Sequence, residues 1–362
     1  MEITNWGSVR EDRPSSLGLR RTTMYRAALI GCGGRASAHV EGYLHIENAE
    51  VVACCAPSPI RRDPLAAKYG IHAYDNPSVM IREEHPDIIH IITWPDTRVE
   101  LMNLVSEHQV SLCTVEKPIS IGTSDWRALT QLEKRTRTKF AVCHQFRWHP
   151  VMIQCQETLK SGKLGKPLML DISSGMNIAG QGTHTLNYGR SLLGDPKVES
   201  VFANLHGWDD SDQGHPAPSS TVAQLTFDNG VRALWTSGSV SPRCGDASTV
   251  WQHVRVAAYA ERGRVLYEEF GKWEIVSDGG AYGGNYGGME EWRKNNILAQ
   301  ACFHKAMFRW LETGEAPGTN LHASLHEWAT VLAIYHSAVE MRPVFLEHFD
   351  PPDNLMDRVR QG

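Results

Sequence analysis

The feature that most constrains this chain is a glycine-rich turn after a short apolar run near the N-terminus. Residues 26–30 are typical of a buried parallel strand, and the spacing Gly31-x-Gly33-x-x-Ala36 follows them. Gly31 permits a tight turn, Gly33 lets the backbone approach a pyrophosphate, and Ala36 lets a helix pack closely on the strand. The N-terminus of that helix offers unpaired N–H groups to phosphate. The strand–turn–helix context favours a dinucleotide site over a plain turn, and its candidate residues are Gly31, Gly33, Gly34, Arg35 and Ala36.

Length and charge exclude several classes of protein. A chain of 362 residues is too long for one typical core, so two domains are expected. The net charge of −5 provides no basic field for nucleic acid or anionic lipid, and no apolar run reaches transmembrane length. The eight cysteines lack C-x-x-C spacing and are typical of a reducing compartment, so we predict a cytoplasmic protein with no nucleic-acid or membrane partner.

The first 23 residues are predicted to be a polar extension, either disordered or packed on a partner subunit. Arg20-Arg21 resembles an export signal, but the apolar stretch that follows is the first strand of the predicted cofactor fold. We therefore do not expect export.

Strand and helix patterns alternate over residues 24–149, which predicts a Rossmann domain with a doubly wound parallel sheet. The expected strands are 26–30, 51–55, 72–74, 88–92, 110–115 and 140–143. Ligands bind outside the carboxyl ends of such strands. Residues 93–96, 116–118 and 144–149 should therefore lie with the glycines along one crevice.

The segment after the second strand bears on cofactor preference. An acidic residue about 20 positions beyond the glycines usually binds the ribose of NAD, and this chain has none there. Ser58, Arg61 and Arg62 lie nearby, and either guanidinium suits a 2′-phosphate. We predict NADP as the cofactor, with NAD as the alternative. The structural alternative for the two arginines is that they are solvated at the start of the next helix.

Residues 150–362 are predicted to form a second α/β domain with a large, open, mainly antiparallel sheet. Expected strands are 168–172, 198–205, 221–227, 231–237, 254–259 and 264–268, and Asp228-Asn229-Gly230 is a hairpin signal. Helices are expected at 296–312 and 321–340, and the glycine-rich run 279–288 is interpreted as a surface loop. His322 and His326 have the spacing of a metal pair but no third ligand, so no metal site is predicted.

Taken together, the motifs resemble those of the Gfo/Idh/MocA family of nucleotide-dependent sugar and cyclitol dehydrogenases. The resemblance covers roughly residues 25–345 and rests on the order of the glycine fingerprint, Thr93-x-Pro95, Glu116-Lys117-Pro118, Arg147-x-His149-Pro150 and Gly182-Thr183-His184. It implies a homodimer or homotetramer assembled through the C-terminal sheet.

The resemblance also implies roles for individual residues. Lys117 and His184 map onto the family's catalytic lysine and histidine, and an imidazole is suited to take a hydroxyl proton near neutral pH. Arg147 suits a substrate carboxylate or hydroxyl pair, with a structural ion pair as an equal alternative. The predicted substrate-binding residues are Lys117, Arg147, His184 and Asn187, and the remaining predicted cofactor-binding residues are Thr93, Trp94, Pro95, Glu116, Lys117 and Gln145.

One departure from the family pattern concerns the proton path. Many members carry an aspartate four residues before the histidine, where this chain has Gly180, and Asn187 stands where another acid is common. The Asp–His relay is therefore absent as usually built. The candidate substitutes are Asp171, Tyr188, His144 and His149, and the sequence does not rank them.

These observations predict an NAD(P)-dependent oxidoreductase that interconverts a secondary hydroxyl of a sugar, sugar acid or cyclitol and a ketone. The altered Gly180/Asn187 pair keeps a second enzyme class open, a lyase, epimerase or glycosidase that cycles the hydride on a retained cofactor. A cofactor-binding protein without turnover is the third alternative, which the presence of both Lys117 and His184 disfavours.

Overall fold

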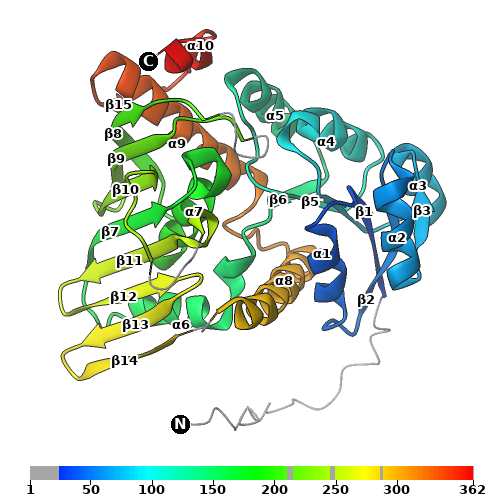
Figure 1. Ribbon diagram of the computed structural model, residues 1–362, viewed down its shortest axis with the longest axis horizontal. Helices are drawn as coiled ribbons and strands as arrows, with labels where there is room; N and C mark the ends of the chain where they lie inside the picture. The colour runs from blue at the N-terminus through cyan, green and yellow to red at the C-terminus, as the bar shows by residue number, and fades with distance from the viewer. Residues whose placement is uncertain (1–23, 210–214, 245–248, 286–287, 362) are drawn as a thin grey trace.

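A computed structural model describes residues 24–209, 215–244, 249–285 and 288–361. The predicted extension at 1–23 lies outside the described residues. The described chain is built on two sheets, seen side by side in Figure 1.

The first sheet has six parallel strands in the order β3-β2-β1-β4-β5-β6, which confirms the doubly wound fold. Apolar, mostly β-branched runs form its buried centre. The strand order reverses on either side of β1, which places a topological switch point beside the glycine turn. The strands are β1 Tyr25–Ile30, β2 Ala49–Cys55, β3 His72–Tyr74, β4 Ile88–Ile91, β5 Leu112–Val115 and β6 Lys139–Val142.

Local capping signals bound the helices that connect these strands. Helix α2 ends at Gly70, whose φ of 66° suits glycine, and helix α3 begins after Asn76, whose side chain accepts from the Val79 N–H. The connecting helices are α1 Ala36–Tyr43, α2 Pro59–Tyr69, α3 Pro77–Glu84, α4 Arg98–Glu107 and α5 Thr123–Arg135. Short 3-10 turns, η1 Pro95–Thr97 and η2 Gln145–Trp148, follow β4 and β6.

The second sheet has nine strands in the order β14-β13-β12-β11-β7-β10-β9-β8-β15. Its described pairs are antiparallel except β7 with β10, as the predicted mainly antiparallel sheet requires. The hairpin predicted at 228–230 joins β9 to β10. The strands are β7 Pro167–Ser174, β8 Val198–His206, β9 Ser220–Phe227, β10 Arg232–Gly238, β11 Val254–Ala260, β12 Gly263–Glu268, β13 Lys272–Ser277, β14 Gly280–Asn285 and β15 Val344–Phe345.

The interpretation of residues 279–288 as a surface loop is wrong for residues 280–285. They form the exposed edge strand β14, paired with β13. The pairing needs glycine, because a Cβ at Gly283 would lie 2.2 Å from the carbonyl oxygen of Trp273. A composition typical of a loop therefore reflects close backbone approach in a sheet.

The remaining helices and short turns follow β6 in the chain. They are α6 Pro150–Lys160, the π-turn η3 Ile178–Gly182, α7 Thr183–Leu192, the 3-10 turn η4 Val250–Gln252, α8 Gly288–Thr313, α9 Leu321–Glu340 and α10 Leu355–Gln361. Helix α8 lies beyond the predicted domain boundary at residue 150 but packs beside α1 (Figure 1). Its Phe303, Met307 and Phe308 share an apolar cluster with Ala27 and Ile88 of the first sheet. The chain therefore returns from the second sheet to cover the first.

Candidate active site

The glycine turn lies at the end of β1 and has the geometry expected for a phosphate site. Gly31 has φ of 109°, and a Cβ there would lie 2.5 Å from the carbonyl oxygen of Ile92. By contrast, a Cβ at Gly33 or Gly34 would meet nothing within 4 Å. Gly31 is thus needed for the turn itself, whereas Gly33 and Gly34 keep the space over the start of α1 open.

A half-buried carboxylate links this turn to the end of β5. Glu116 Oε1 lies 3.1 Å from His39 Nε2 and 3.5 Å from Arg35 Nε, both on or beside α1. Although burial opposes ionisation, Arg35 and His39 hold the pKa of Glu116 well below its ordinary value. Arg35 also donates to Asn296 and Gln300 of α8, each at 3.3 Å. Glu116 and Arg35 therefore join the glycine turn to the end of β5 and to α8.

Arg98, which no sequence motif indicated, connects the loops that follow β4 and β5. It is fully buried at the start of α4, and its guanidinium donates to the backbone carbonyls of Thr93, at 3.1 Å, and of Glu116. Burial lowers its pKa to about 10, still far above neutral. The Thr93–Asp96 and Glu116–Pro118 loops are thus held by one cation, and nothing in the linear sequence signals it.

Lys117 and His184 lie in the same site. The Lys117 ammonium donates to the carbonyl of Gly180, one turn before His184. Burial and the neighbouring charges of His144 and Lys117 lower the pKa of His184 well below its ordinary value. His184 is therefore neutral at pH 7 and able to accept a proton.

The structure ranks the four candidates for a group beside His184. His144 Nδ1 lies 2.9 Å and the Tyr188 hydroxyl 3.3 Å from His184 Nδ1. Asp171 instead pairs with Arg255 on the second sheet, and His149 Nε2 lies 3.0 Å from Asn295 Oδ1. His144 and Tyr188 are thus the two that contact the imidazole.

Arg147 and Asn187, predicted to bind substrate, are themselves buried and have protein partners. Arg147 forms a bidentate ion pair with Asp195, and its Nη1 lies 3.4 Å from Asn187 Oδ1. The Asn187 amide donates to Glu327 Oε1 at 2.8 Å. The ion pair that was the alternative role for Arg147 is therefore present in the structure.

The other predicted cofactor residues line the carboxyl ends of the strands. Thr93 is half-buried and its Oγ1 lies 2.6 Å from Thr97 Oγ1, Pro95 is buried, and Trp94 is 49% exposed. Gln145 donates to Asn296 Oδ1 at 3.1 Å, which links it to Arg35.

Ser58 and Arg61 lie exposed at the start of α2, beside the expected ribose position. Arg62 points back, because it donates to Asp63 at 2.7 Å and to the Ala56 carbonyl at 3.4 Å.

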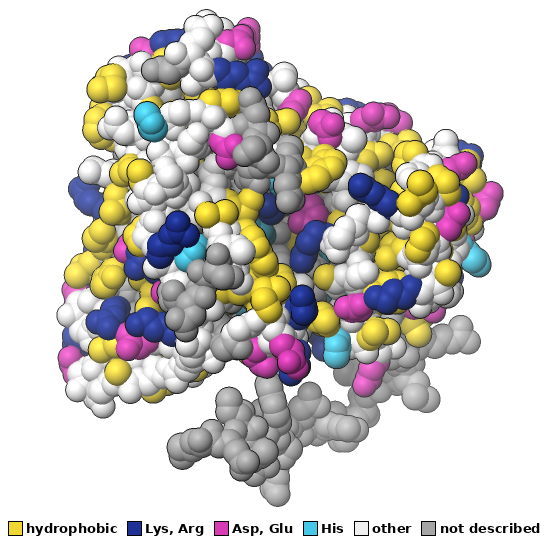
Figure 2. All heavy atoms as spheres, viewed as in Figure 1, with side chains coloured by type: hydrophobic (Ala, Val, Ile, Leu, Met, Phe, Trp, Pro, Cys, Tyr) yellow, Lys and Arg dark blue, Asp and Glu magenta, His cyan; other side chains and the backbone are white. Residues whose placement is uncertain are grey.

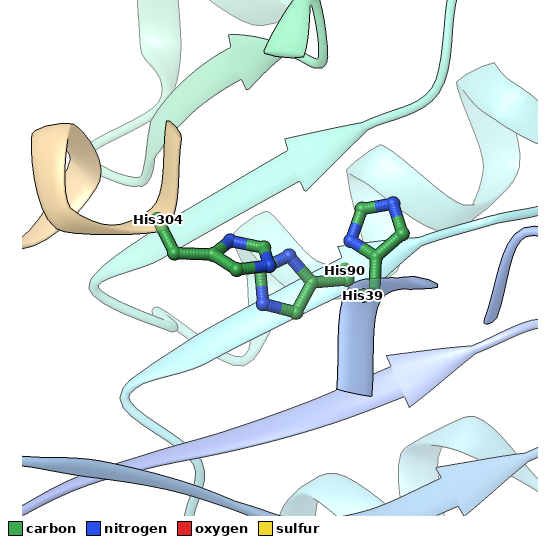
Figure 3. Close-up of side chains that lie close together, drawn as sticks. All are labelled: His39, His90 and His304. Carbon is green, nitrogen blue, oxygen red and sulfur yellow. The ribbon is translucent and has the colours of Figure 1, made fainter. Parts of the chain in front are cut away.

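A cluster of three histidines, which no sequence motif indicated, lies between α1, β4 and α8. His39 of α1, His90 of β4 and His304 of α8 are buried together (Figure 3). Their mutual spacing would suit a metal ion, but protein groups already engage them. Gln300 Nε2 lies 3.4 Å from both His39 Nδ1 and His304 Nε2, and His90 contacts Tyr43 and Thr114. Burial lowers the pKa of all three, so they are neutral hydrogen-bonding groups of the core.

The molecule is hollowed between the parts built on the two sheets, and Figure 2 shows charged side chains of both signs gathered there. No helix among the described residues is long and apolar enough to span a bilayer.

Part of the chain matches a known protein family. Residues 25–144 match the oxidoreductase family with an NAD-binding Rossmann fold, Gfo/Idh/MocA. A D-apiose dehydrogenase from Paraburkholderia graminis is 27% identical over 190 residues, 47% of this chain and 50% of that protein. A myo-inositol 2-dehydrogenase from Thermotoga maritima is 23% identical over 222 residues, 57% of this chain and 66% of that protein. The chain thus spans about half the length of the first curated relatives that it matches.

The fold as a whole also matches a solved structure. An oxidoreductase from Agrobacterium radiobacter, in complex with NAD+, L-tartaric acid and magnesium, superposes with a TM-score of 0.76 at 20% identity. The match covers 90% of this chain and 99% of that chain, so the two-sheet architecture is shared over nearly its full length.

Proposed function

We propose that the protein is an NAD(P)-dependent dehydrogenase, on the premise that residues 25–144 match the Gfo/Idh/MocA oxidoreductase family. Its substrate would be a sugar, sugar acid or cyclitol, oxidised at a secondary hydroxyl or formed by the reverse reduction. The observation that carries this proposal is the placement of Lys117 and His184 together beside the glycine turn. Relatives named for D-apiose and myo-inositol support the substrate class.

The residues at the turn fit a dinucleotide. The open space over Gly33 and Gly34 admits a pyrophosphate, and the N-terminus of α1 supplies N–H groups toward it. Arg35 and Glu116 would hold the nicotinamide end, with Thr93 and Pro95 along the strand edge. When bound, the cofactor supplies hydride acceptance or donation.

Within this site, the chain's own groups manage the proton. Neutral His184 accepts the hydroxyl proton as the carbinol becomes a ketone. The Lys117 ammonium stabilises negative charge on the substrate oxygen. Both groups act in a setting poor in water, where charge interactions are stronger.

For the cofactor, we propose NADP over NAD. Ser58 and the exposed Arg61 lie at the N-terminus of α2, where a 2′-phosphate finds a hydroxyl, a guanidinium and backbone N–H groups. An Arg61→Ala variant should lose affinity for NADPH at least several-fold and leave NADH affinity unchanged. Equal losses for both cofactors would contradict this preference.

The activity is tested with purified protein, NADP+ or NAD+ and a panel of polyols that includes D-apiose and myo-inositol, read as reduced-nicotinamide absorbance. Lys117→Met and His184→Asn serve as inactive controls that retain the fold. Absence of both cofactor binding and turnover with every polyol would refute the proposal.

A second candidate is a lyase, epimerase or glycosidase that retains its cofactor. It is favoured by the His144–His184 pair where many family members have an aspartate and a histidine. Product formation without net reduced cofactor would identify this class, and stoichiometric reduced cofactor would exclude it.

For assembly, we propose a homodimer or homotetramer through the outer face of the second sheet. Met169 and Tyr259 lie opposite each other on β7 and β11, and Phe202 and Val222 lie on neighbouring strands, each 38–40% exposed. Phe202→Glu should shift the protein toward monomer in sedimentation velocity. An unchanged sedimentation coefficient would argue against this face.

A further inference from the structure

The imidazole proposed to accept the substrate proton is backed by a second imidazole. His144 begins η2 at the end of β6, and its Nδ1 lies 2.9 Å from His184 Nδ1, with the rings nearly perpendicular at 84°. Both side chains are at least 92% buried. Because both contacts of His184 use Nδ1, its Nε2 is the nitrogen left for a substrate.

The far nitrogen of His144 faces a buried carboxylate. His144 Nε2 lies 3.8 Å from Glu327 Oε2, on the first half of α9. The other oxygen of Glu327 accepts from Arg190 at 2.5 Å and from Asn187 at 2.8 Å, which fixes the carboxylate in place. A small cavity lined by Pro118, Thr183, His144 and Glu327 adjoins this gap.

Resting on the proposed function, we propose that His144 and Glu327 are positioning residues of a proton relay behind His184. They replace the aspartate that Gly180 lacks. The proton-accepting form of His184 has a bare Nε2 and therefore carries its hydrogen on Nδ1, which donates to His144 Nδ1. His144 then carries its own hydrogen on Nε2, toward Glu327.

The proton balance follows from these tautomers. In oxidation, the substrate hydroxyl gives its proton to His184 Nε2, the carbinol carbon gives its hydride to bound NAD(P)+, and the C–O bond becomes C=O. His184 passes its Nδ1 proton to His144 Nδ1. The positive charge then rests on His144, beside the carboxylate of Glu327, and the reverse transfers serve reduction.

The surroundings set which of these groups is charged before the reaction. Burial lowers the pKa of His144 to about 3 in the resting protein, so neither imidazole holds the charge before reaction. Burial also raises the pKa of Glu327, against the pull of Arg190, which makes the carboxylate a better partner for a proton near neutral pH. The other groups whose charge or hydroxyl acts on the pair are Arg35, Glu116, Lys117, Arg147, Arg190 and Tyr188.

The relay is tested with His144→Asn, Glu327→Gln and the double variant. Asparagine keeps an acceptor for the Nδ1–H of His184 but cannot pass a proton on, and it does not touch Arg190. His326→Gln is the matched control, because His326 is the half-buried histidine next to Glu327 on α9 and its Nε2 accepts from the Val198 N–H.

Each single variant should lower the plateau kcat for oxidation by about 10²-fold, and Glu327→Gln should also move the acidic limb of the kcat profile to lower pH. NADPH affinity should stay within two-fold. The double variant should lose no more than the worse single one, since both interrupt one path. An acidic limb at the wild-type pH in Glu327→Gln, or a loss of kcat that is equal at every pH, would overturn the proposed relay.

A second readout does not depend on turnover. In protein labelled with 15N-histidine and free of cofactor, the shared Nδ1 proton should give a downfield proton resonance. It should be absent from His184→Asn, shifted in His144→Asn and in Glu327→Gln, and unchanged in His326→Gln. A resonance at the wild-type position in His144→Asn would overturn the pairing. Failure of the proposed function would show separately, as wild-type protein that binds neither NADPH nor NADH.

Discussion

Alanine substitutions at Gly31 and Gly33 should separate folding from cofactor binding, although the two glycines belong to one motif. Gly31 has φ of 109°, which a residue with a Cβ rarely adopts, and its Cβ would lie 2.5 Å from the Ile92 carbonyl oxygen. Gly33 has an ordinary φ, and its Cβ would meet no atom within 4 Å. The two substitutions therefore have different physical costs.

The cost of Gly31→Ala follows from two terms. Backbone strain in this region costs about 1–3 kcal/mol, and overpacking against a fixed strand end costs about 1–3 kcal/mol more. Their sum, roughly 2–6 kcal/mol, corresponds to a fall in Tm of about 3–8 °C for a chain of 362 residues. Gly33→Ala should leave stability unchanged or raise it by about 0.4–1 kcal/mol, because alanine restricts the unfolded chain.

For cofactor binding, Gly33→Ala should be the more damaging of the two substitutions. A methyl group at Gly33 enters the space that we assign to the pyrophosphate, so Gly33→Ala should weaken NADPH binding at least about ten-fold, or 1.4 kcal/mol. Thermal unfolding followed by circular dichroism and titration calorimetry with NADPH measure the two quantities. Wild-type Tm in Gly31→Ala, or wild-type affinity in Gly33→Ala, would refute this reading of the turn.

Three further predictions concern other parts of the site. Lys117→Met should lower kcat by about 10²-fold or more while the NADPH dissociation constant changes less than three-fold, measured by steady-state kinetics and calorimetry; a kcat within ten-fold of wild type would contradict the role of the ammonium. Arg98→Met should lower the free energy of unfolding in urea by about 2–4 kcal/mol, because the carbonyls of Thr93 and Glu116 lose a charged donor. A loss below about 1 kcal/mol would contradict the role of Arg98 in holding the two loops. Stability should fall as pH drops below about 6.5, because the unfolded chain binds protons that His144, His215 and His326, each with a folded pKa of about 3, do not; each contributes up to about 1.4 kcal/mol per pH unit, and a Tm constant from pH 7.5 to 5 would contradict this.

The first sheet was predictable because each of its strands is a short apolar run between capped helices, and such local signals need no tertiary information. The same holds for the β9–β10 hairpin and for α9, whose bounds agree with the expected 321–340. Strand β14 failed the same reasoning, since its glycines serve contact with a neighbouring strand that the linear sequence does not display. The start of α8 was placed eight residues too late for a similar reason, because its first two turns are polar and exposed.

For the site, sequence reasoning found residues that carry a motif and missed those that support them. Glycine spacing and strand ends located Gly31, Glu116 and Lys117. Glu327 and Arg98 had no such signal, because a lone charged residue on an amphipathic helix usually faces solvent. Their roles arise from long-range burial, as the contact between Glu327 and His144 shows across more than 180 positions of chain.

The return of α8 to the first sheet has a consequence for how the protein is made. A ribosome that has translated residue 150 has supplied all six strands of the nucleotide-binding sheet, but not the helix that shields Ala27 and Ile88. At roughly 5–20 residues per second, about ten to thirty seconds pass before α8 is complete. Until then one apolar side of the nascent sheet is exposed, so we expect the growing chain to bind a chaperone that covers exposed apolar surfaces.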